Sequence, residues 1–586
     1  MKFKQITETQ GKVDIINLVL ENRNIPHMDN FLNAEKLNEE TDSSLMLNME
    51  AGVKLYLEHI EKESVIGVLV DSDADGKTSG ASMFSYTNKN FSHIDVRYIV
   101  HDTKAHGITK YAIEKIKDSG INLLIVPDSG SNDVEHANIL KDMGIDLIVI
   151  DHHPVTTPIE YGVLINNQLC DYSNKNFTGV GMVYKFLQLV DKLNERAQSV
   201  FANDFLDLVA IGQIGDSSDI SDPEIRKLVV SGLKNMRNGF VRTAVLQDVG
   251  LMGITPKELS FSIIPVINAV TRVGTVEERE LLFEAMADIN PDRQFIVQKK
   301  KKNKDTGKFD TLELTFTLYQ QAYDVSKKVK SRQDSAVKKM LPIIEEKIDK
   351  DLSVIVAISN NKEMPGISGL VANKLVNKYD KPAILFNDKD KTFSGSGRGC
   401  EKVIADFRKW CEDTQLFEFA QGHDNAFGLE IRKENYDLFI EYIKNNLEQI
   451  DEIEYEVDIL VSSPSKEDCE KVYINRDLFG GSVSEPLIGL QNLKVPRRFI
   501  SNRGAVLNIF SWGVTIVKFS TNEELLEEIK NYPNDEIVFN IVGTYSMNNW
   551  GGRLSPQLVV KDIELVYNHE TSEYNNNIDE NGELIF

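Results

Sequence analysis

Three aspartates stand at alternating positions directly after the apolar run 65–70; they are Asp71, Asp73 and Asp75. Alternate residues of a strand share a face, so these carboxylates can converge where the chain leaves the edge of a sheet. Carboxylates gathered in this way are typical ligands of a divalent cation. A calcium loop of the EF-hand type is disfavoured, because its twelfth position is Ser82 where such loops have a bidentate glutamate. The stretch is therefore a candidate cation site.

More acids and imidazoles follow later apolar runs. Run 123–126 leads into Asp128, run 147–150 leads into Asp151, His152 and His153, and a further apolar segment ends at Asp216. Open α/β sheets bind ligands at the carboxyl ends of their strands, so we expect these groups to meet there. Carboxylates with imidazoles suit Mn²⁺ or Mg²⁺ better than thiophilic metals, and two ions bridged by one acid are the natural interpretation. Taken singly, Asp128 and Asp216 would more often be turn residues or helix N-caps than metal ligands.

The elements that must position these groups alternate between strand and helix from residue 64 onward. The expected strands are 65–70, 94–100, 123–126 and 147–150, and the expected helices lie near 78–88, 110–117 and 133–143. This alternation predicts a parallel sheet covered by helices, and strands that are apolar throughout fit burial on both faces. Residues 1–62 and most of 181–237 are expected to be helical.

Length and composition restrict the class of protein. With 586 residues, 41% of them hydrophobic, the chain should form several domains. Its net charge of −24 argues against a broad basic nucleic-acid surface and leaves only local basic tracks as candidates. Four scattered cysteines without a CxxC pair indicate reduced thiols. The sequence contains neither a signal-peptide core nor a run of about 18 apolar residues, so we expect a cytoplasmic protein without a membrane partner.

The acidic motifs resemble, in order, the four metal-site motifs of the DHH phosphoesterases, a family named after the triplet that stands here at residues 151–153. Within that family the chain is most similar to the RecJ-type single-strand-specific exonucleases, over nearly its whole length. The resemblance implies an α/β fold: a parallel-sheet DHH domain, a long helical connector, a second α/β domain called DHH-associated, and a C-terminal OB-like β-barrel. The implied segments are a helical lead-in (1–62), the DHH domain (63–294), a basic helical connector (295–350), a substrate-binding domain (351–452), a nucleic-acid-binding domain (453–566) and a mobile tail (567–586).

The resemblance also implies roles for individual residues. The implied metal ligands are Asp73, Asp75, Asp128, His152 and Asp216. Asp71 would ligate or support, Asp151 would orient the histidines, and His153 would donate a hydrogen bond to a phosphoryl oxygen. The implied contacts to substrate phosphate are His106, Asn268, Arg272, Arg398 and His423. For Asn268 and Arg272, a polar loop that caps a helix is the alternative interpretation.

Local basic stretches are the candidate nucleic-acid contacts. Lys299–Lys302 and a later set of basic residues that includes Arg332 could follow a phosphate backbone, although a solvated helix face explains such runs equally well. Residues 307–323 do not match the family pattern, and their role is open. Two glycine-rich turns, 395–398 and 422–428, could approach a phosphate through backbone amides. In the C-terminal region the candidates are Arg497, Arg498 and Arg503, for which structural packing is the alternative.

The family resemblance implies a metal-dependent 5′-to-3′ exonuclease that hydrolyses single-stranded DNA to nucleoside 5′-monophosphates in repair, recombination or replication. Two divalent cations, Mn²⁺ or Mg²⁺, would be its cofactors. Single-stranded DNA would be its substrate, a single-strand-binding protein or a helicase a candidate partner, and a monomer the expected state. The alternatives are a DHH-family oligoribonuclease or small-substrate phosphatase, and a non-catalytic DNA-binding scaffold. Chain length and the filled ligand positions favour the exonuclease.

Overall fold

The computed structural model describes most of the chain. The described residues are 1–7, 14–25, 27–37, 40–169, 171–194, 196, 198–250, 253–302, 307, 309–359, 365–400, 403–446, 454–519, 521, 523–550 and 552–567. The chain divides into two compact units: Asp29–Ile450 forms one, and Met1–Met28 joins Asp451–Phe586 in the other. Apart from Tyr567, the expected mobile tail lies outside the described residues, as does Cys170.

A five-stranded parallel sheet carries the acidic motifs. Its strand order is β3-β2-β4-β5-β6, and every neighbouring pair is parallel. The strands are β2 (Ile66–Val70), β3 (Val96–Val100), β4 (Leu123–Pro127), β5 (Asp146–Asp151) and β6 (Val163–Asn166). Strands β2, β3, β4 and β5 confirm the four predicted strands. Strand β6 was not predicted.

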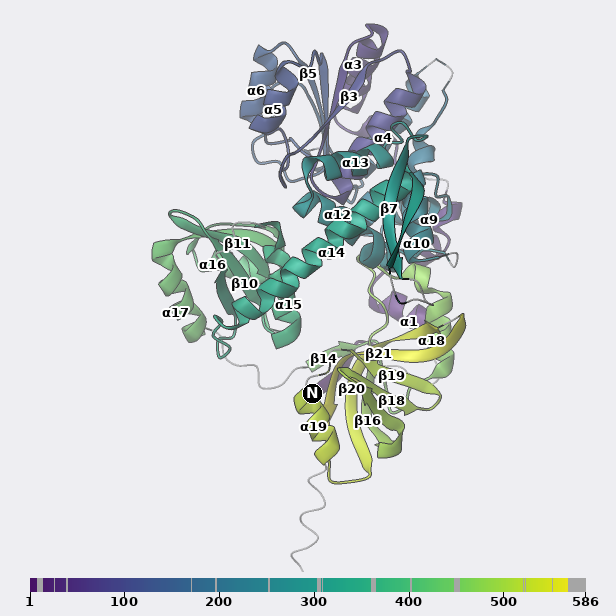
Figure 1. The fold of residues 1–586 in the computed structure, drawn as a ribbon, viewed down its shortest axis with the longest axis vertical. Helices are drawn as coiled ribbons and strands as arrows, with labels where there is room; N and C mark the ends of the chain where they lie inside the picture. Colours follow the sequence, from purple (N-terminus) through teal and green to yellow (C-terminus); the bar gives the residue numbers. More distant parts are fainter. Residues whose placement is uncertain are drawn as a thin grey trace, which may run out of the picture. The chain divides into compact units, whose positions relative to one another are not determined.

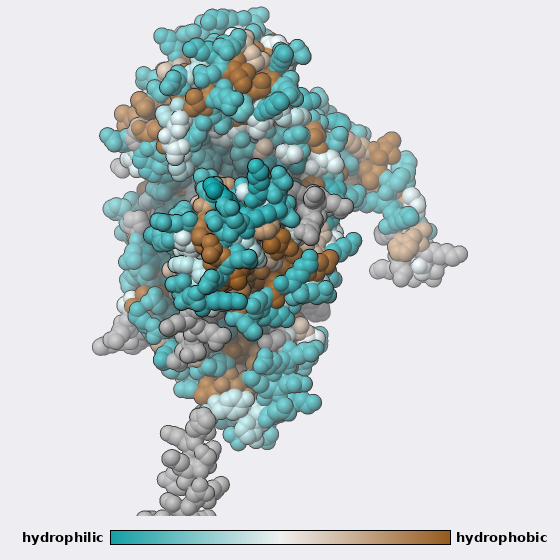
Figure 2. All heavy atoms as spheres, turned by 90° about the vertical axis from the view of Figure 1, so that its left-hand side faces the viewer, coloured by the Kyte–Doolittle hydropathy of each residue, from teal (hydrophilic) through white to brown (hydrophobic). Residues whose placement is uncertain are grey.

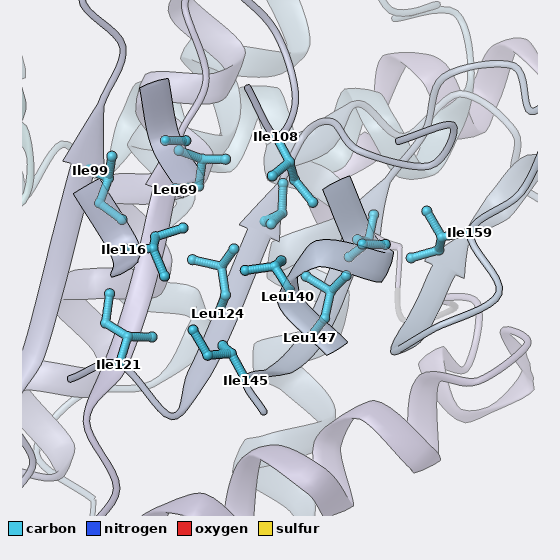
Figure 3. Close-up of a cluster of buried hydrophobic side chains, with 14 of the residues drawn as sticks. Leu69, Ile99, Ile108, Ile116, Ile121, Leu124, Leu140, Ile145, Leu147 and Ile159 are labelled. Atoms are coloured by element: carbon cyan, nitrogen blue, oxygen red, sulfur yellow. The ribbon is translucent and has the colours of Figure 1, made fainter. Parts of the chain in front are cut away.

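Helices cover both faces of this sheet, as the continuous apolar runs predicted. Helices α5 (Lys110–Lys117) and α6 (Val134–Asp142) enclose a core on one face, and Figure 3 shows its side chains packed between strands and helices. Helices α4 (Ala74–Asn90), α7 (Gly179–Leu193) and α8 (Leu206–Gly215) pack together on the other. Because alternate strand residues point to opposite faces, Leu124 enters the first core while Ile125 is buried on the second face.

The segment 295–350 differs from the expected helical connector in its first part. It starts with an antiparallel hairpin of β7 (Gln294–Lys302) and β8 (Phe309–Thr317), and only then enters the long helix α14 (Leu318–Glu345) (Figure 1). Apolar residues alternate with polar ones along β8, which is the period of a strand. Thr317 caps α14 in a capping box with Gln320, so the helix begins at Leu318.

Helix α14 leads from the first sheet to a second one. On its way it packs against α10 (Gly239–Asp248), α12 (Ile264–Val273) and α13 (Val276–Met286), and later against β9 and α15. The second sheet has the order β12-β13-β11-β10-β9, in which only the β9–β10 pair is parallel. Its elements are β9 (Ile355–Ser359), α15 (Ser368–Tyr379), β10 (Ala383–Asp388), β11 (Thr392–Arg398), α16 (Phe407–Asp413), β12 (Phe417–His423), β13 (Ala426–Arg432) and α17 (Tyr436–Asn446).

The segment 351–452 begins with strand β9, helix α15 and strand β10, which agrees with the α/β character that the resemblance implied for it. The expectation of a glycine-rich turn is wrong for residues 395–398 and is met in part by residues 422–428. Residues 395–398 lie inside β11, paired with β10 on one side and β13 on the other. Residues 422–428 form the turn of the β12–β13 hairpin together with parts of both strands. The small residues therefore sit within a sheet, where their backbone amides belong to strand pairing.

The other unit combines both ends of the chain. Strand β1 (Lys2–Gln5) pairs in parallel with β14 (Glu454–Val457), which corrects the expectation that residues 1–62 are helical throughout. Within residues 1–62 the α-helices are α1 (Ile15–Asn22) and, farther along the chain, α2 (Met28–Leu32) and α3 (Met49–Glu61), so the helical prediction is confirmed for these segments. The Asp458 carboxylate is fully buried and accepts two hydrogen bonds from the Arg23 guanidinium, at 2.7 and 2.8 Å. This bidentate pair joins the N-terminal segment to the C-terminal one.

A seven-stranded mixed sheet forms the body of this unit, with the order β15-β16-β20-β21-β19-β18-β17. The strands are β15 (Ile459–Val461), β16 (Ile488–Pro496), β17 (Ile500–Arg503), β18 (Val506–Ser511), β19 (Val514–Lys518), β20 (Glu536–Trp550) and β21 (Arg553–Leu565), with helices α18 (Lys466–Ile474) and α19 (Glu523–Asn531).

The surface and the cysteines of the described residues match what the composition indicated: a largely hydrophilic exterior and thiols without disulfides. Hydrophilic side chains cover most of the face shown in Figure 2, and hydrophobic ones lie in separate groups between them. Among the described residues, no helix is both long and apolar enough to cross a membrane. Cys400, Cys411 and Cys469 are buried, and none of the three is joined in a disulfide.

Candidate active site

The acidic motifs meet at one edge of the parallel sheet. Asp71 follows β2, Asp128 follows β4, and β5 ends at Asp151. Parallel strands place their carboxyl ends at the same edge, as the sequence predicted. Asp75 lies in the first turn of α4, and Asp216 is the C-cap of α8, which packs on α4. The fold thus brings together residues that are up to 145 positions apart in the sequence.

The imidazole of His152 lies among three carboxylates. Its Nε2 is 3.2 Å from Asp128 Oδ1, 3.5 Å from Asp216 Oδ2 and 3.9 Å from Asp75 Oδ2. Although they are buried, His152 Nε2 and Asp128 Oδ1 form no hydrogen bond. An imidazole nitrogen and a carboxylate oxygen left without hydrogen bonds, with two further carboxylates within 3.9 Å of that nitrogen, are a donor set for a divalent cation. These four side chains fit the metal that the sequence motifs imply.

Electrostatics at this cluster support the same interpretation. Burial, together with the positive charge of His153, lowers the pKa of His152 to about 4, so its imidazole is neutral and able to ligate a metal at neutral pH. Burial and neighbouring carboxylates raise the pKa values of Asp75, Asp128 and Asp216. Acids crowded in this way resist ionisation until a positive charge joins them. A bound cation would supply that charge.

The N-terminus of α7 holds Asp75 in place. The Asp75 carboxylate accepts hydrogen bonds from Thr178 Oγ1 at 3.0 Å, from the backbone N–H of Gly179 at 2.6 Å, and from that of Val180 at 3.0 Å. Two glycines permit this close packing. A Cβ on Gly179 would lie 2.3 Å from Asp128 Oδ1, and one on Gly212 would lie 2.3 Å from Asp75 Oδ1. Both positions therefore exclude any larger side chain unless the carboxylates move.

Asp128 has a left-handed backbone conformation, with φ of 69°. This region is unfavourable for most residues but is accessible to aspartate and asparagine. Its backbone N–H donates to the carbonyl of Ile150 at 2.7 Å, which ties the turn after β4 to β5. The conformation directs the chain out of the sheet beside His152, where the carboxylate contributes to the cluster.

Asp151 supports the histidines beside it. Its Oδ1 accepts hydrogen bonds from the backbone N–H of His152 at 2.7 Å and of His153 at 3.1 Å, and it contacts His153 Nδ1 at 2.8 Å. Burial opposes ionisation of Asp151, but its partners, led by His153, outweigh burial and lower its pKa. Burial likewise opposes protonation of His153, yet the bond to Asp151 raises the pKa of His153 to about 9. His153 is therefore a cationic donor beside the cluster at neutral pH.

Asp71 and Asp73 form a second group, with His106. The Asp71 carboxylate lies 2.5 Å from His106 Nδ1 and accepts the Gly107 N–H at 3.0 Å. Burial would raise the pKa of Asp71, but the His106 hydrogen bond and charge lower it. Asp73 caps α4 by accepting the Gly76 N–H at 2.9 Å. Candidate ligand atoms of Asp71, Asp73 and His106 lie within 4.8 Å of one another.

The residues expected to contact phosphate lie on several elements. Asn268 and Arg272 are on α12, and the buried Oδ1 of Asn268 forms no hydrogen bond. Burial lowers the pKa of Arg272, although the charge of Asp73 opposes that shift. Arg398 ends β11 and donates to the Gly397 carbonyl at 2.6 Å, and burial followed by repulsion from Arg272 lowers its pKa to about 10. His423 is exposed at the end of β12.

The arginines expected to contact nucleic acid differ in their surroundings. Arg332 on α14 donates to Glu278 at 2.7 Å and to the Val273 carbonyl at 2.8 Å, so it joins α14 to its neighbours. Arg497 donates to four backbone carbonyls around the end of α19 and is committed to packing contacts. Arg498 lies over the Phe499 ring at 5.0 Å, and Arg503 is exposed on β17.

Three groups near the site were not predicted from the sequence. His101, directly after β3, is buried with Nε2 4.0 Å from Asp71 Oδ1, and its place after a strand was a signal that could have found it. Lys77 is buried in α4, where burial and the charge of Arg279 lower its pKa to about 7. Lys104 interacts electrostatically with Arg272 and with Asp73. A single lysine in a loop gives no sequence signal.

Comparison with known proteins places the chain in a family. The model of the DHH family, N-terminal domain, matches residues 65–213. A Bacillus subtilis protein named as an SPbeta prophage-derived single-strand DNA-specific exonuclease, YorK, is 30% identical over 97% of this chain and 98% of its own length. The single-stranded-DNA-specific exonuclease RecJ of Bacillus subtilis is 26% identical over 88% of this chain and 63% of its own length.

A solved structure shares the fold. The crystal structure of Thermus thermophilus RecJ in complex with Mn²⁺ superposes with a TM-score of 0.69 at 19% identity, covering 94% of this chain and 76% of that one. The agreement extends across both units of the chain. Together with the ordered motifs and the shared family model, these relatives show that the chain belongs to the DHH family, among RecJ-like proteins.

Proposed function

We propose that this protein is a metal-dependent exonuclease that degrades single-stranded DNA from a 5′ end to nucleoside 5′-monophosphates. The observation that carries the proposal is the convergence of Asp75, Asp128 and Asp216 on the neutral imidazole of His152. The names of the relatives supply the substrate class and the metal, because two are named as single-strand-DNA-specific exonucleases and a RecJ structure is described as a complex with Mn²⁺. The direction of degradation comes from the family resemblance alone.

Two divalent cations, Mn²⁺ or Mg²⁺, are the proposed cofactors. The residues proposed to hold them are Asp73, Asp75, Asp128, His152 and Asp216, with Asp71 in support. When bound, such cations supply a nucleophile at neutral pH and neutralise charge on the phosphoryl group. The α7 N-terminus keeps Asp75 oriented through three hydrogen bonds. The hydrogen bond between Asp71 and His106 holds the 106–107 loop beside the site.

The remaining side chains would act on the phosphate itself. Asp151 keeps His153 protonated, so His153 can donate a hydrogen bond to a nonbridging phosphoryl oxygen as negative charge develops there. Burial lowers the pKa values of Arg272 and Arg398, and repulsion from Arg272 adds to the shift at Arg398. A substrate phosphate would relieve that repulsion, and guanidinium groups bind phosphate in a bidentate manner.

The C-terminal unit is proposed to bind the single strand through an OB-like surface. Exposed aromatics and arginines lie near the start of its hairpin strands: Arg498 covers the Phe499 ring, and Phe499 lies 6.3 Å from the Phe510 ring. Trp512, in the turn after β18, is 74% exposed. Single-strand binders combine such stacking platforms with basic groups that track the backbone. Arg503 completes this candidate surface.

The test is degradation of defined substrates with Mn²⁺. The substrates are 5′-labelled single-stranded DNA, the same sequence as a duplex, a short RNA, and a bis-phosphorylated nucleotide. We expect rapid loss of the single strand with release of labelled mononucleotide, and Asp128→Asn should abolish it while the exposed control Asp118→Asn does not. Consumption of only the RNA or the nucleotide would favour an oligoribonuclease or phosphatase. Binding of DNA without hydrolysis of any substrate would favour a scaffold.

A further inference from the structure

Asn166 is the last residue of β6 and lies at the same edge of the first sheet as the acidic motifs. Strand β6 pairs in parallel with β5, and in this register Asn166 stands directly opposite Asp151. The residue is 1% exposed and belongs to none of the groups proposed to hold metal or phosphate. Buried polar side chains are hydrogen-bonded in native proteins, so the partners of this amide show what it supports.

The Asn166 amide is hydrogen-bonded through both of its polar atoms. Its Nδ2 donates to the His153 carbonyl at 3.0 Å and to Ser131 Oγ at 2.9 Å, and its Oδ1 accepts the Gln168 N–H at 2.8 Å. Turning the amide over would place oxygen against the carbonyl of His153 and nitrogen against the N–H of Gln168, which pairs two acceptors and two donors. The contacts therefore require an amide in this orientation.

Ser131 extends these contacts to Asp151. The Ser131 N–H donates to Asp151 Oδ2 at 3.1 Å, and Asp151 Oδ1 contacts His153 Nδ1 at 2.8 Å. Because Asn166 binds both Ser131 and His153, the four residues form a closed circuit of hydrogen bonds. Ser131 lies in the turn that starts at Asp128 after β4, and His153 lies in the turn after β5. Asn166 thus joins the two turns that carry these site residues.

The position of the His153 ring depends on this circuit. The side chain is 51% exposed, and its Nδ1 is held by Asp151. The next residue, Pro154, has no N–H, so the His153 backbone is fixed by its own N–H, which is bound to Asp151, and by its own carbonyl, which is bound to Asn166. Loss of the carbonyl contact would free this peptide group and displace the ring. A displacement of about 1 Å can lower an enzymatic rate by about 10²-fold.

We propose that Asn166 is a positioning residue, which fixes the His153 imidazole where it donates to the phosphoryl group and does so through the His153 carbonyl and Ser131. The inference rests on the proposed function, which gives His153 that role. The alternative is that Asn166 only joins β6 to the neighbouring turns and contributes to stability alone. The two roles predict different results in kinetics and in spectra of the histidine ring.

The kinetic test compares full-length Asn166→Ala with Asn167→Ala as its matched control. Asn167 is the next residue and is also fully buried, but its Nδ2 donates to the Asn174 carbonyl at 3.3 Å, outside the circuit. Hydrolysis of labelled single-stranded DNA at increasing substrate concentration with Mn²⁺ gives kcat and KM. Thermal melting shows that each variant is folded.

Asn166→Ala should lower kcat and kcat/KM equally, by about 10- to 100-fold, because His153 acts on charge that develops only in the transition state. The KM should stay that of wild type, and Asn167→Ala should keep wild-type kinetics. An equal loss of kcat in both folded variants, or a loss confined to KM, would overturn the proposal.

A double-mutant cycle tests whether Asn166 acts through His153. Once His153→Ala has removed the ring, the further change Asn166→Ala should cause little additional loss of kcat, since residues that act through one another are not additive. An undiminished loss from Asn166→Ala in the His153→Ala protein would overturn the proposal.

Spectra of nitrogen-labelled histidine, recorded in EDTA, test the positioning without catalysis. His153→Ala identifies the signals of the His153 ring by their disappearance. Asn166→Ala should shift or broaden these signals, and Asn167→Ala should leave them unchanged. Unchanged ring signals in Asn166→Ala would overturn the proposal for any substrate. Absence of hydrolysis by wild type would instead refute the proposed function, and the spectra would still decide the positioning.

Discussion

Substitution of Gly179 by alanine should disable the site by steric displacement alone. The added Cβ would lie 2.3 Å from Oδ1, 2.4 Å from Cβ and 2.5 Å from Cγ of Asp128. Carbon atoms approach favourably to about 3.5 Å, so the two side chains must separate by about 1 Å. Neither can move easily, because α7 is buried against α4 and Asp128 is fixed in its left-handed turn.

The expected loss follows from that displacement. Misplacement of a group by about 1 Å can lower an enzymatic rate by about 10²-fold, and altered support of a metal ligand typically weakens metal affinity by about 10- to 100-fold. Calorimetric titration with Mn²⁺ would measure the affinity, and hydrolysis of labelled single-stranded DNA at increasing Mn²⁺ would measure the rate. Part of the activity should return at high Mn²⁺, since the ligands remain chemically intact.

A matched glycine provides the control. On β13, a Cβ at Gly428 would meet its nearest atoms at 3.9 Å, which is ordinary contact, so Gly428→Ala should behave as wild type. Thermal melting of both variants would separate a local effect from misfolding. If folded Gly179→Ala bound Mn²⁺ and degraded DNA as well as wild type does, Asp128 could not be a ligand held in the position described here.

Three further perturbations test other parts of the molecule. Arg23→Met should destabilise the unit formed by the two chain ends by about 3–5 kcal/mol in urea unfolding, because it leaves the buried Asp458 carboxylate without its guanidinium partner. Loss of the exposed Lys4–Glu456 pair should have little effect. Equal effects of the two changes would refute this reasoning. Burial raises the pKa of Asp207, so its ionised form opposes folding above the folded-state pKa and this penalty disappears as pH falls toward its unfolded pKa of about 4. Wild type should accordingly gain stability relative to Asp207→Asn between pH 7 and pH 4, and a constant difference across that range would contradict the assignment. Removal of divalent cations by EDTA should abolish hydrolysis and lower the melting temperature. The reason for the lower melting temperature is that a metal at 100 times its Kd stabilises the folded state by about 2.7 kcal/mol. Identical melting temperatures with and without Mn²⁺ would argue against the metal site.

Local patterns were sufficient to predict four of the five strands of the first sheet and the set of acids at its edge. Strands buried on both faces produce continuous apolar runs, and the polar residues that end such runs must lie at the carboxyl edge of a parallel sheet. This is why Asp71, Asp128 and Asp151 could be assigned to one edge before the fold was known. The hairpin at β7–β8 was missed because lysines at the end of β7 hide the alternation that is visible in β8.

The sequence alone determined which residue types could form a cation site, their order along the chain and the family they resemble. Tertiary structure decided how those residues divide: Asp75, Asp128 and Asp216 meet at His152, while Asp71 pairs with His106 and Asp73 caps α4. It also decided that Arg332 and Arg497 are engaged in packing contacts. The physical reason is that ligand geometry depends on distances between segments far apart in the chain, and those distances are set by how helices such as α7 and α8 pack, which no local pattern records.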